Sequence, residues 1–267
     1  MSTQFKIDLV LIRHAESEYN LEQRKACNSS TEVKNGENLQ TKFKKDLIDC
    51  SLTEEGKNQC LQAEQICENL NIGIVLVSPL RRALETCKEI FKNHKNKPKV
   101  IVNPLFREML LSNCDIGGRI LESKEDFPEY DFSFLEQYEN PILWNVYELT
   151  NKQKVQEIEA NIKNICVQES IQIKKHGHFK LLEIIKQMFP VHIESQQEYN
   201  QNVQLQKQYI LNLLEKMPQG TKIAIVGHSR ALESFTAASY ENETLIGAHW
   251  FKNAEVYQMQ LDVNQQM

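Results

Sequence analysis

Short, nearly continuous apolar runs with the length of buried strands recur along the chain. The clearest cover 7–12, 72–77 and 222–226, and weaker runs cover 99–102 and 254–261. Apolar runs without strict hydrophobic–polar alternation are typical of a sheet that is covered on both faces. We therefore expect these segments to belong to one central sheet.

Helical periodicity alternates with these strands. It covers 57–70, 81–91 and 230–239, and Thr53 stands where it can cap the first of these helices, with two glutamates after it. Alternation of strands with helices favours an α/β fold with a mostly parallel sheet. We expect a three-layer α/β/α sandwich.

The stretch from about 120 to 220 has a different composition, rich in Gln, Asn, Lys and Glu and poor in strand-like runs. Apolar residues still recur there with the spacing of a helix face. They are Val155, Ile158, Ile162 and Ile165, and then Val203, Ile210, Leu213 and Met217. Because the strands after this stretch are needed to complete the sheet, we expect a single domain over 1–267 with a helical insertion at about 120–220.

Composition and charge exclude several classes of protein. The net charge of −5 is unfavourable for a nucleic-acid partner, and the nine glycines form neither a dinucleotide fingerprint nor a P-loop. No apolar run approaches the ~18 residues of a membrane span, and the N-terminus lacks a basic leader region. Seven cysteines without a C-x-x-C pair argue against a disulfide framework or a thiolate zinc site. We expect a cytoplasmic protein with no membrane partner.

Basic side chains follow three of the predicted strands at their carboxyl ends. Arg13 and His14 follow the first strand, Arg82 comes soon after the strand 72–77, and His228 follows the strand 222–226. Ligands of open α/β sheets bind at this edge. Taken one at a time, these are ordinary surface loops, but four such groups at one edge repel one another unless an anion lies between them. Guanidinium groups suit phosphate, so the joint pattern predicts a phosphate site.

Longer motifs around these residues resemble the histidine phosphatase superfamily, in its phosphoglycerate-mutase-like branch. The matching elements are R-H-G/A-x-[ST]-x-x-N at 13–20, L-T-x-x-G-x-x-Q at 52–59, S-x-L-x-R-A-x-x-T at 78–86, the R-E pair at Arg107-Glu108, and G-H at Gly227-His228. The third element selects Arg82 over Arg81 as the arginine of the pocket. The matches span about residues 5 to 260.

This resemblance implies a metal-independent phosphomonoester hydrolase that needs no cofactor. His14 would be the nucleophile that forms a phosphohistidine, and Glu108 would be the general acid and base. The residues that would bind the phosphoryl group are Arg13, Arg82, His228, Asn20 and Ser17. The substrate would be a phosphorylated small molecule or a phosphoprotein.

Two other functions stay open at this level. One is phosphoryl transfer of the phosphoglycerate-mutase type, which the missing Y-G-x-L-x-G-L-N-K stretch disfavours. The other is non-catalytic binding of a phospho-ligand or a protein, which the complete set of implied catalytic residues disfavours. Without the resemblance, Glu108 is best interpreted as a solvated loop carboxylate. His176-Gly177-His178 is interpreted as an exposed turn rather than a metal pair. Arg119 and Arg230 are candidate substrate contacts, but an arginine in such a place is more often a salt-bridge residue.

Overall fold

The central sheet of the computed structural model has five strands in the order β5-β4-β6-β1-β9. The structure describes residues 6–29, 33–34, 37–38, 47–118, 120–138, 143–168, 181, 183–184, 193–214, 217–218 and 220–262. The strands are β1 (Lys6–Arg13), β4 (Ile72–Val77), β5 (Lys99–Val102), β6 (Lys222–Gly227) and β9 (Val256–Asp262). β9 pairs antiparallel with β1, and the other pairings are parallel. The predicted mostly parallel sheet is therefore confirmed.

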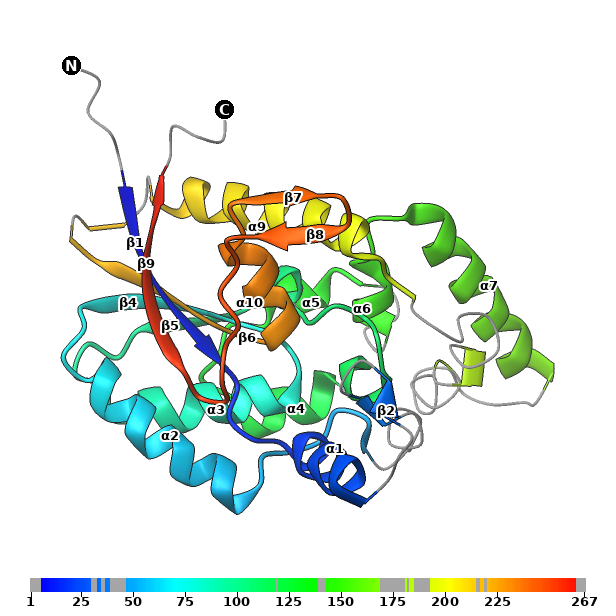
Figure 1. The fold of residues 1–267 in the computed structure, drawn as a ribbon, viewed down its shortest axis with the longest axis horizontal. Coiled ribbons are helices and arrows are strands. Elements are labelled where there is room, and N and C mark those ends of the chain that lie inside the picture. The colour runs from blue at the N-terminus through cyan, green and yellow to red at the C-terminus, as the bar shows by residue number, and fades with distance from the viewer. Residues whose placement is uncertain are drawn as a thin grey trace.

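Alternate residues of the strands point to opposite faces of the sheet, and helices cover both. Val10 and Ile12 belong to the cluster under α2 (Glu54–Cys67) and α3 (Arg81–Phe91). Leu9 and Leu11 belong to the cluster under α9 (Gln196–Leu214) and α10 (Ser229–Thr236). Figure 1 shows α2 and α3 on one side of the sheet and α9 and α10 on the other. This is the predicted three-layer sandwich, and burial of both strand faces explains the lack of alternation in the sequence.

The ends of α2 differ from the periodicity prediction by a few residues. The helix begins at Glu54, directly after Thr53, whose side chain accepts a hydrogen bond from the backbone N–H of Gly56. Thr53 is thus the predicted N-cap. The helix ends at Cys67 rather than at residue 70, because Leu70 donates its N–H to Cys67 in a turn that leads into β4.

Two boundaries near the C-terminus also need correction. α10 ends at Thr236 rather than at 239, because Ala237 adopts an extended ψ of 135°. The chain then forms a hairpin, β7 (Ser239–Glu241) and β8 (Thr244–Ile246), which the apolar pattern did not predict. β9 begins at Val256 rather than at 254, because Ala254 has a positive φ of 56° that interrupts an extended strand.

Helices follow one another between β5 and β6. They are η3 (Pro104–Phe106), η4 (Asn113–Asp115), α4 (Ile120–Asp126), α5 (Ser133–Glu136), α6 (Trp144–Tyr147), α7 (Lys152–Gln168) and α9. The predicted apolar face of α7 is confirmed, since Val155, Ile158 and Ile162 are buried and Ile165 packs at the edge of the same cluster. In α9, Val203 and Ile210 are buried against the sheet.

The remaining elements lie near the N-terminus. They are α1 (Glu18–Ser29), β2 (Val33–Lys34) and β3 (Glu37–Asn38). All seven cysteines of the chain are free thiols. Within the described ranges, no helix combines the length and the apolar character that a membrane span requires.

A buried ion pair ties the segment before α9 to the segment that follows β5. The guanidinium of Arg107 donates to both carboxylate oxygens of Glu194 at 2.7 Å, and each side chain is 1% exposed. Glu194 also accepts the backbone N–H of Leu110 at 3.1 Å. The two charged groups are tolerated at this depth because each neutralises the charge of the other.

We expect Glu194→Ala to lower the free energy of unfolding by about 3–5 kcal/mol, because it leaves the Arg107 charge buried and unpaired. Urea denaturation should show a lower midpoint at an unchanged slope. Glu136→Gln is the matched control, since Glu136 pairs with Lys124 and is 60% exposed. Its loss should stay within about 1 kcal/mol. Equal losses in the two variants would contradict this account.

Candidate active site

The carboxyl ends of β1, β6 and β4 bring the predicted basic residues to one edge of the sheet. Arg13 pairs in register with Gly227, and His14 donates its backbone N–H to Gly227 at 2.9 Å. Ser78, just before Arg82, donates its N–H to Val226 at 3.1 Å. Adjacent parallel strands therefore place three loops side by side, as expected from the sequence.

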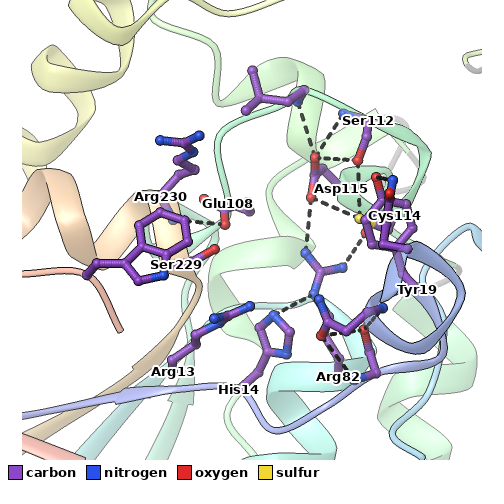
Figure 2. A pocket seen from close by; sticks show the side chains of 15 residues that line it. Arg13, His14, Tyr19, Arg82, Glu108, Ser112, Cys114, Asp115, Ser229 and Arg230 are labelled. Carbon is purple, nitrogen blue, oxygen red and sulfur yellow. Dashed lines mark hydrogen bonds and ion pairs between the residues drawn. The ribbon is translucent and has the colours of Figure 1, made fainter. Parts of the chain in front are cut away.

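A pocket of about 270 Å³ opens at this edge. Of the seven predicted site residues, those that line it are Arg13, His14, Ser17, Asn20, Arg82 and Glu108. His228 is fully buried and does not line the pocket, but the centre of its ring lies 5.1 Å from that of His14. Figure 2 shows Arg13 and His14 on one side of the pocket and Glu108 facing them from another segment.

The hydrogen bonds of His14 determine its tautomer. Nδ1 lies 2.7 Å from the carbonyl oxygen of Ala15, which can only accept, so Nδ1 carries the ring proton. Nε2 in turn accepts a hydrogen bond from Nε of Arg82 at 3.2 Å. The ring is therefore neutral, and the lone pair of Nε2 faces the guanidinium of Arg82 in the pocket (Figure 2).

Electrostatics keep this ring neutral. Burial is the main cause that lowers the pKa of His14 well below its usual value, and the positive charges of Arg82 and Arg13 lower it further. The pKa of His228 is lowered well below its usual value for the same reasons, burial first and then Arg82. A neutral imidazole is the form that can act as a nucleophile.

The first turn of α3 separates two neighbouring arginines. Arg81 points outward, where it forms an ion pair with Asp126 at 2.6 Å. Arg82 points inward and is 3% exposed. Its Nη1 donates to the carbonyl of Cys114, and its Nη2 pairs with Asp115 at 3.1 Å. The geometry thus agrees with the motif, which selected Arg82.

Two further nitrogen atoms are buried near His14 without a partner among the described residues. They are Nε of Arg13 and Nδ1 of His228. Nη1 of Arg13 donates to the carbonyl of Phe251 at 2.8 Å, and Nε2 of His228 lies 2.7 Å from the hydroxyl of Ser78. Buried polar nitrogens normally have partners, and Nε of Arg13 can only donate, so it marks a place in the pocket where an acceptor group would be stabilised.

Glu108 is a buried carboxyl group at the N-terminus of α10. Its side chain is 8% exposed, and its two oxygens accept backbone N–H groups from Met109, Arg230 and Ala231 at 2.9 to 3.2 Å. Burial, followed by the nearby charge of Asp115, raises the pKa of Glu108 to about 7. The interpretation of Glu108 as a solvated loop carboxylate is therefore wrong, because helix N–H groups draw it into the pocket.

Ser17 and Asn20 form one small network at the start of α1. Oδ1 of Asn20 accepts from the backbone N–H and the hydroxyl of Ser17 at 3.1 and 3.0 Å, and from Asn253 at 3.3 Å. The amide oxygen of Asn20 is thus already bonded. Its amide nitrogen is the group that Asn20 can offer to a ligand in the pocket.

Several pocket residues were outside the predicted set, chiefly Asp115, Tyr19, Ser229 and Trp250. Arg230, a candidate substrate contact, lies at the pocket with its guanidinium 5.1 Å from the ring centre of Trp250. Tyr19 lies within the motif at 13–20 and Ser229 directly follows Gly227-His228, whereas no motif in the sequence marked Asp115 or Trp250. Arg119 and the His176–His178 turn lie outside the described residues. Among the described residues, no three His, Cys, Asp or Glu side chains are grouped to hold a metal ion.

Comparison with known proteins places the chain in a family. The model of the histidine phosphatase superfamily (branch 1) matches residues 9–179. The chain belongs to this superfamily. The matched region contains Arg13, His14, Arg82 and Glu108, and it ends before His228, which the fold brings to His14 from β6.

Individual proteins are also similar to this member of the superfamily. A probable phosphatase from Schizosaccharomyces pombe is 34% identical over 96 residues, which cover 34% of this chain and 43% of the relative. The chain thus spans less than half of that relative. A phosphoglycerate mutase from Bacillus anthracis is 12% identical, with a TM-score of 0.52 over 97% of this chain and 89% of its own. A mycobacterial hydrolase is 16% identical, with a TM-score of 0.50 over 96% and 92%. The two structures show a shared fold.

Proposed function

We propose that this protein is a phosphomonoester hydrolase that forms a phosphohistidine on His14 and uses Glu108 as its general acid and base. One observation carries the proposal: a neutral histidine and a carboxyl group with a raised pKa face the same pocket. The ring of His14 offers a lone pair at Nε2, and the pKa of Glu108 is raised to about 7. Groups whose environments set their protonation in this way are typical of acid–base and nucleophilic catalysis.

In the first step, Nε2 of His14 attacks the phosphorus atom, and the bond from phosphorus to the alcohol oxygen breaks. Glu108 transfers its proton to that oxygen, so the alcohol leaves neutral. In the second step, Glu108 takes a proton from water, the water oxygen attacks phosphorus, and the bond to Nε2 breaks. Inorganic phosphate leaves, and both groups return to their starting protonation.

The side chains of Arg82, Arg13 and His228 would bind the phosphoryl oxygens. Arg82 now donates from Nε to the nucleophile, so a bound phosphoryl oxygen would take over that donor and release the lone pair for attack. Nε of Arg13 would gain the acceptor that it lacks among the described residues, and His228 lies beside the nucleophile, with the two ring centres 5.1 Å apart. Donors aimed at the charge that develops in the transition state are the main source of catalysis in phosphoryl transfer.

The proposal is tested by measuring released phosphate over a panel of sugar phosphates, phosphoglycerates, nucleotides and phosphopeptides. A hydrolase releases inorganic phosphate from at least one class. A mutase would instead move the phosphoryl group between the hydroxyls of phosphoglycerate, which NMR of the product distinguishes. A phospho-ligand binder would bind members of the panel, as measured by calorimetry, and turn over none of them. Either of the last two results contradicts the proposal.

Activity is expected to survive an excess of EDTA. Arg13 and Arg82 line the pocket and supply the positive charge that a metal ion would otherwise bring to the phosphoryl group. The measurement compares initial rates with EDTA alone and after Mg²⁺ or Zn²⁺ is added back. A strict requirement for either ion would show that the charge assigned to the arginines comes from a metal.

A further inference from the structure

A second buried carboxylate, Asp115, lies in the same pocket as Glu108. Its side chain is 6% exposed, and each of its oxygens has a separate set of partners. Oδ2 accepts the backbone N–H groups of Leu111 and Ser112 at 3.2 and 2.9 Å, and the Ser112 hydroxyl at 3.0 Å. Oδ1 pairs with Arg82 at 3.1 Å. One oxygen therefore holds the loop after Glu108, and the other holds the arginine.

Arg82 is held along one edge so that its other edge faces the nucleophile. Nη1 and Nη2 bond to the carbonyl of Cys114 and the carboxylate of Asp115, whereas Nε points to Nε2 of His14 (Figure 2). A planar guanidinium keeps one orientation when two of its nitrogen atoms are bonded in this manner. Among the described residues, Asp115 is the carboxylate that forms an ion pair with Arg82.

The charge of Asp115 also acts on Glu108. The ionisable side chains that interact with Glu108 include Arg13 of β1, Arg82 of α3, Asp115 of η4 and Tyr199 of α9. After burial, Asp115 is the largest influence that raises the pKa of Glu108, while Arg82 opposes that rise. A negative charge beside a carboxyl group favours its protonated form.

We propose that Asp115 is a positioning residue that aligns Arg82 on the nucleophile and places its negative charge in the pocket that it shares with Glu108. This inference rests on the proposed function, since it assigns Glu108 the role of acid and Arg82 the role of phosphoryl ligand. Asp115 touches neither the phosphoryl group nor the leaving oxygen in this scheme. It acts on the phosphoryl group through Arg82 and on the leaving oxygen through Glu108.

Asp115→Asn separates this role from simple support of the loop. In this variant the amide oxygen can still accept the N–H groups of Leu111 and Ser112. The amide nitrogen then faces Arg82, and the negative charge is lost. We expect kcat/KM for alkyl phosphates to fall roughly 10²-fold near neutral pH, the scale of a small misplacement at a reacting centre. We also expect the alkaline limb of the pH profile to move to lower pH, because Glu108 then ionises more easily.

Asp126→Asn is the matched control. It removes the carboxylate from another Asp–Arg pair, that of Asp126 with Arg81. Arg81 is the neighbour of Arg82 in the chain, but neither Arg81 nor Asp126 lines the pocket. It should leave both kcat/KM and the alkaline limb unchanged. Asp115→Glu keeps the charge but displaces Arg82, so kcat/KM should fall while the alkaline limb stays near that of the wild type. If Asp115→Asn does not fold, Asp115→Glu carries the test, and an unchanged kcat/KM in that variant contradicts the proposal.

A readout without turnover separates this inference from the proposed function. The Glu108 carboxyl can be titrated by carbon NMR in protein with labelled glutamate and assigned with Glu108→Gln. Its pKa should be lower in Asp115→Asn than in the wild type. If the wild type hydrolyses no phosphomonoester, the proposed function fails, and with it the assigned roles, whatever this titration shows. If the wild type is active and both the titration and the alkaline limb are unmoved in Asp115→Asn, only the positioning role is overturned.

Discussion

His14→Ala is expected to abolish turnover while the protein stays folded. The variant removes Nε2, the atom whose lone pair is free of the ring proton because Nδ1 donates to Ala15. Loss of an activated nucleophile lowers kcat on the order of 10⁴–10⁶-fold. Steady-state phosphate release measures the loss, and circular dichroism with thermal melting checks the fold.

The matched control for this variant is His94→Ala. His94 is also buried, with its Nε2 3.1 Å from the carbonyl of Cys67, and it does not line the pocket. Its replacement should lower stability and leave kcat largely intact. Rapid quenching of the wild type with labelled substrate should also trap an acid-labile, base-stable phosphoryl group on His14. An adduct on another residue, or full activity in His14→Ala, would overturn the mechanism.

Glu108→Gln is expected to cost more on poor leaving groups than on good ones. An alkoxide needs the proton that Glu108 donates, so activity on alkyl phosphates should fall about 10²–10⁴-fold. The p-nitrophenolate ion leaves without that proton, so the loss on p-nitrophenyl phosphate should be smaller while phosphorylation of His14 limits the rate. Burst kinetics identify the limiting step, because Glu108 also activates water in the second one.

The pH profile gives a second readout for Glu108. The acid form must be present for the first step, and the pKa of Glu108 is raised to about 7. For alkyl phosphates, kcat/KM of the wild type should therefore fall about tenfold per pH unit above that value, and Glu108→Gln should lose this limb. The pKa of His14 is lowered well below the usual value for histidine. The nucleophile therefore stays neutral even when the pH falls below that usual value.

The control for Glu108→Gln is Glu16→Gln, which changes another buried carboxylate beside the site. Glu16 is 3% exposed, pairs with Arg24 and does not line the pocket. It should leave the dependence on the leaving group unchanged. Equal, near-wild-type rates of Glu108→Gln on both substrates would remove Glu108 from the site and reopen the choice of acid.

The elements of the sheet and one of its helices could be predicted closely from local pattern. Strands 72–77 and 99–102 and helix 81–91 have the bounds that their apolar runs and periodicity indicated. Such patterns report burial, and burial on both faces of a sheet leaves a continuous run. The ends of α2 and α10 were less predictable, because a turn at Leu70 and the start of a hairpin after Ala237 decide them.

The part of the candidate site that could be predicted is the set of basic side chains at the carboxyl ends of the parallel strands. Arg13, His14 and His228 stand at the carboxyl ends of two predicted strands, so the α/β pattern predicted that they share one edge of the sheet. The structure adds that these two strands are parallel neighbours. The motif also selected Arg82 over Arg81, and helix geometry agrees, since consecutive residues on a helix point in different directions.

Tertiary structure alone decided the protonation and support of these groups. Nothing local in the sequence indicates that Glu194 neutralises Arg107 from 87 residues away, or that helix N–H groups of Arg230 and Ala231 hold Glu108. The positioning role proposed for Asp115 depends likewise on its pairing with Arg82 across the pocket. Residue types and their places at the ends of strands are written in the sequence, but a pKa depends on burial and on charges a few ångströms away, which exist only once distant segments pack together.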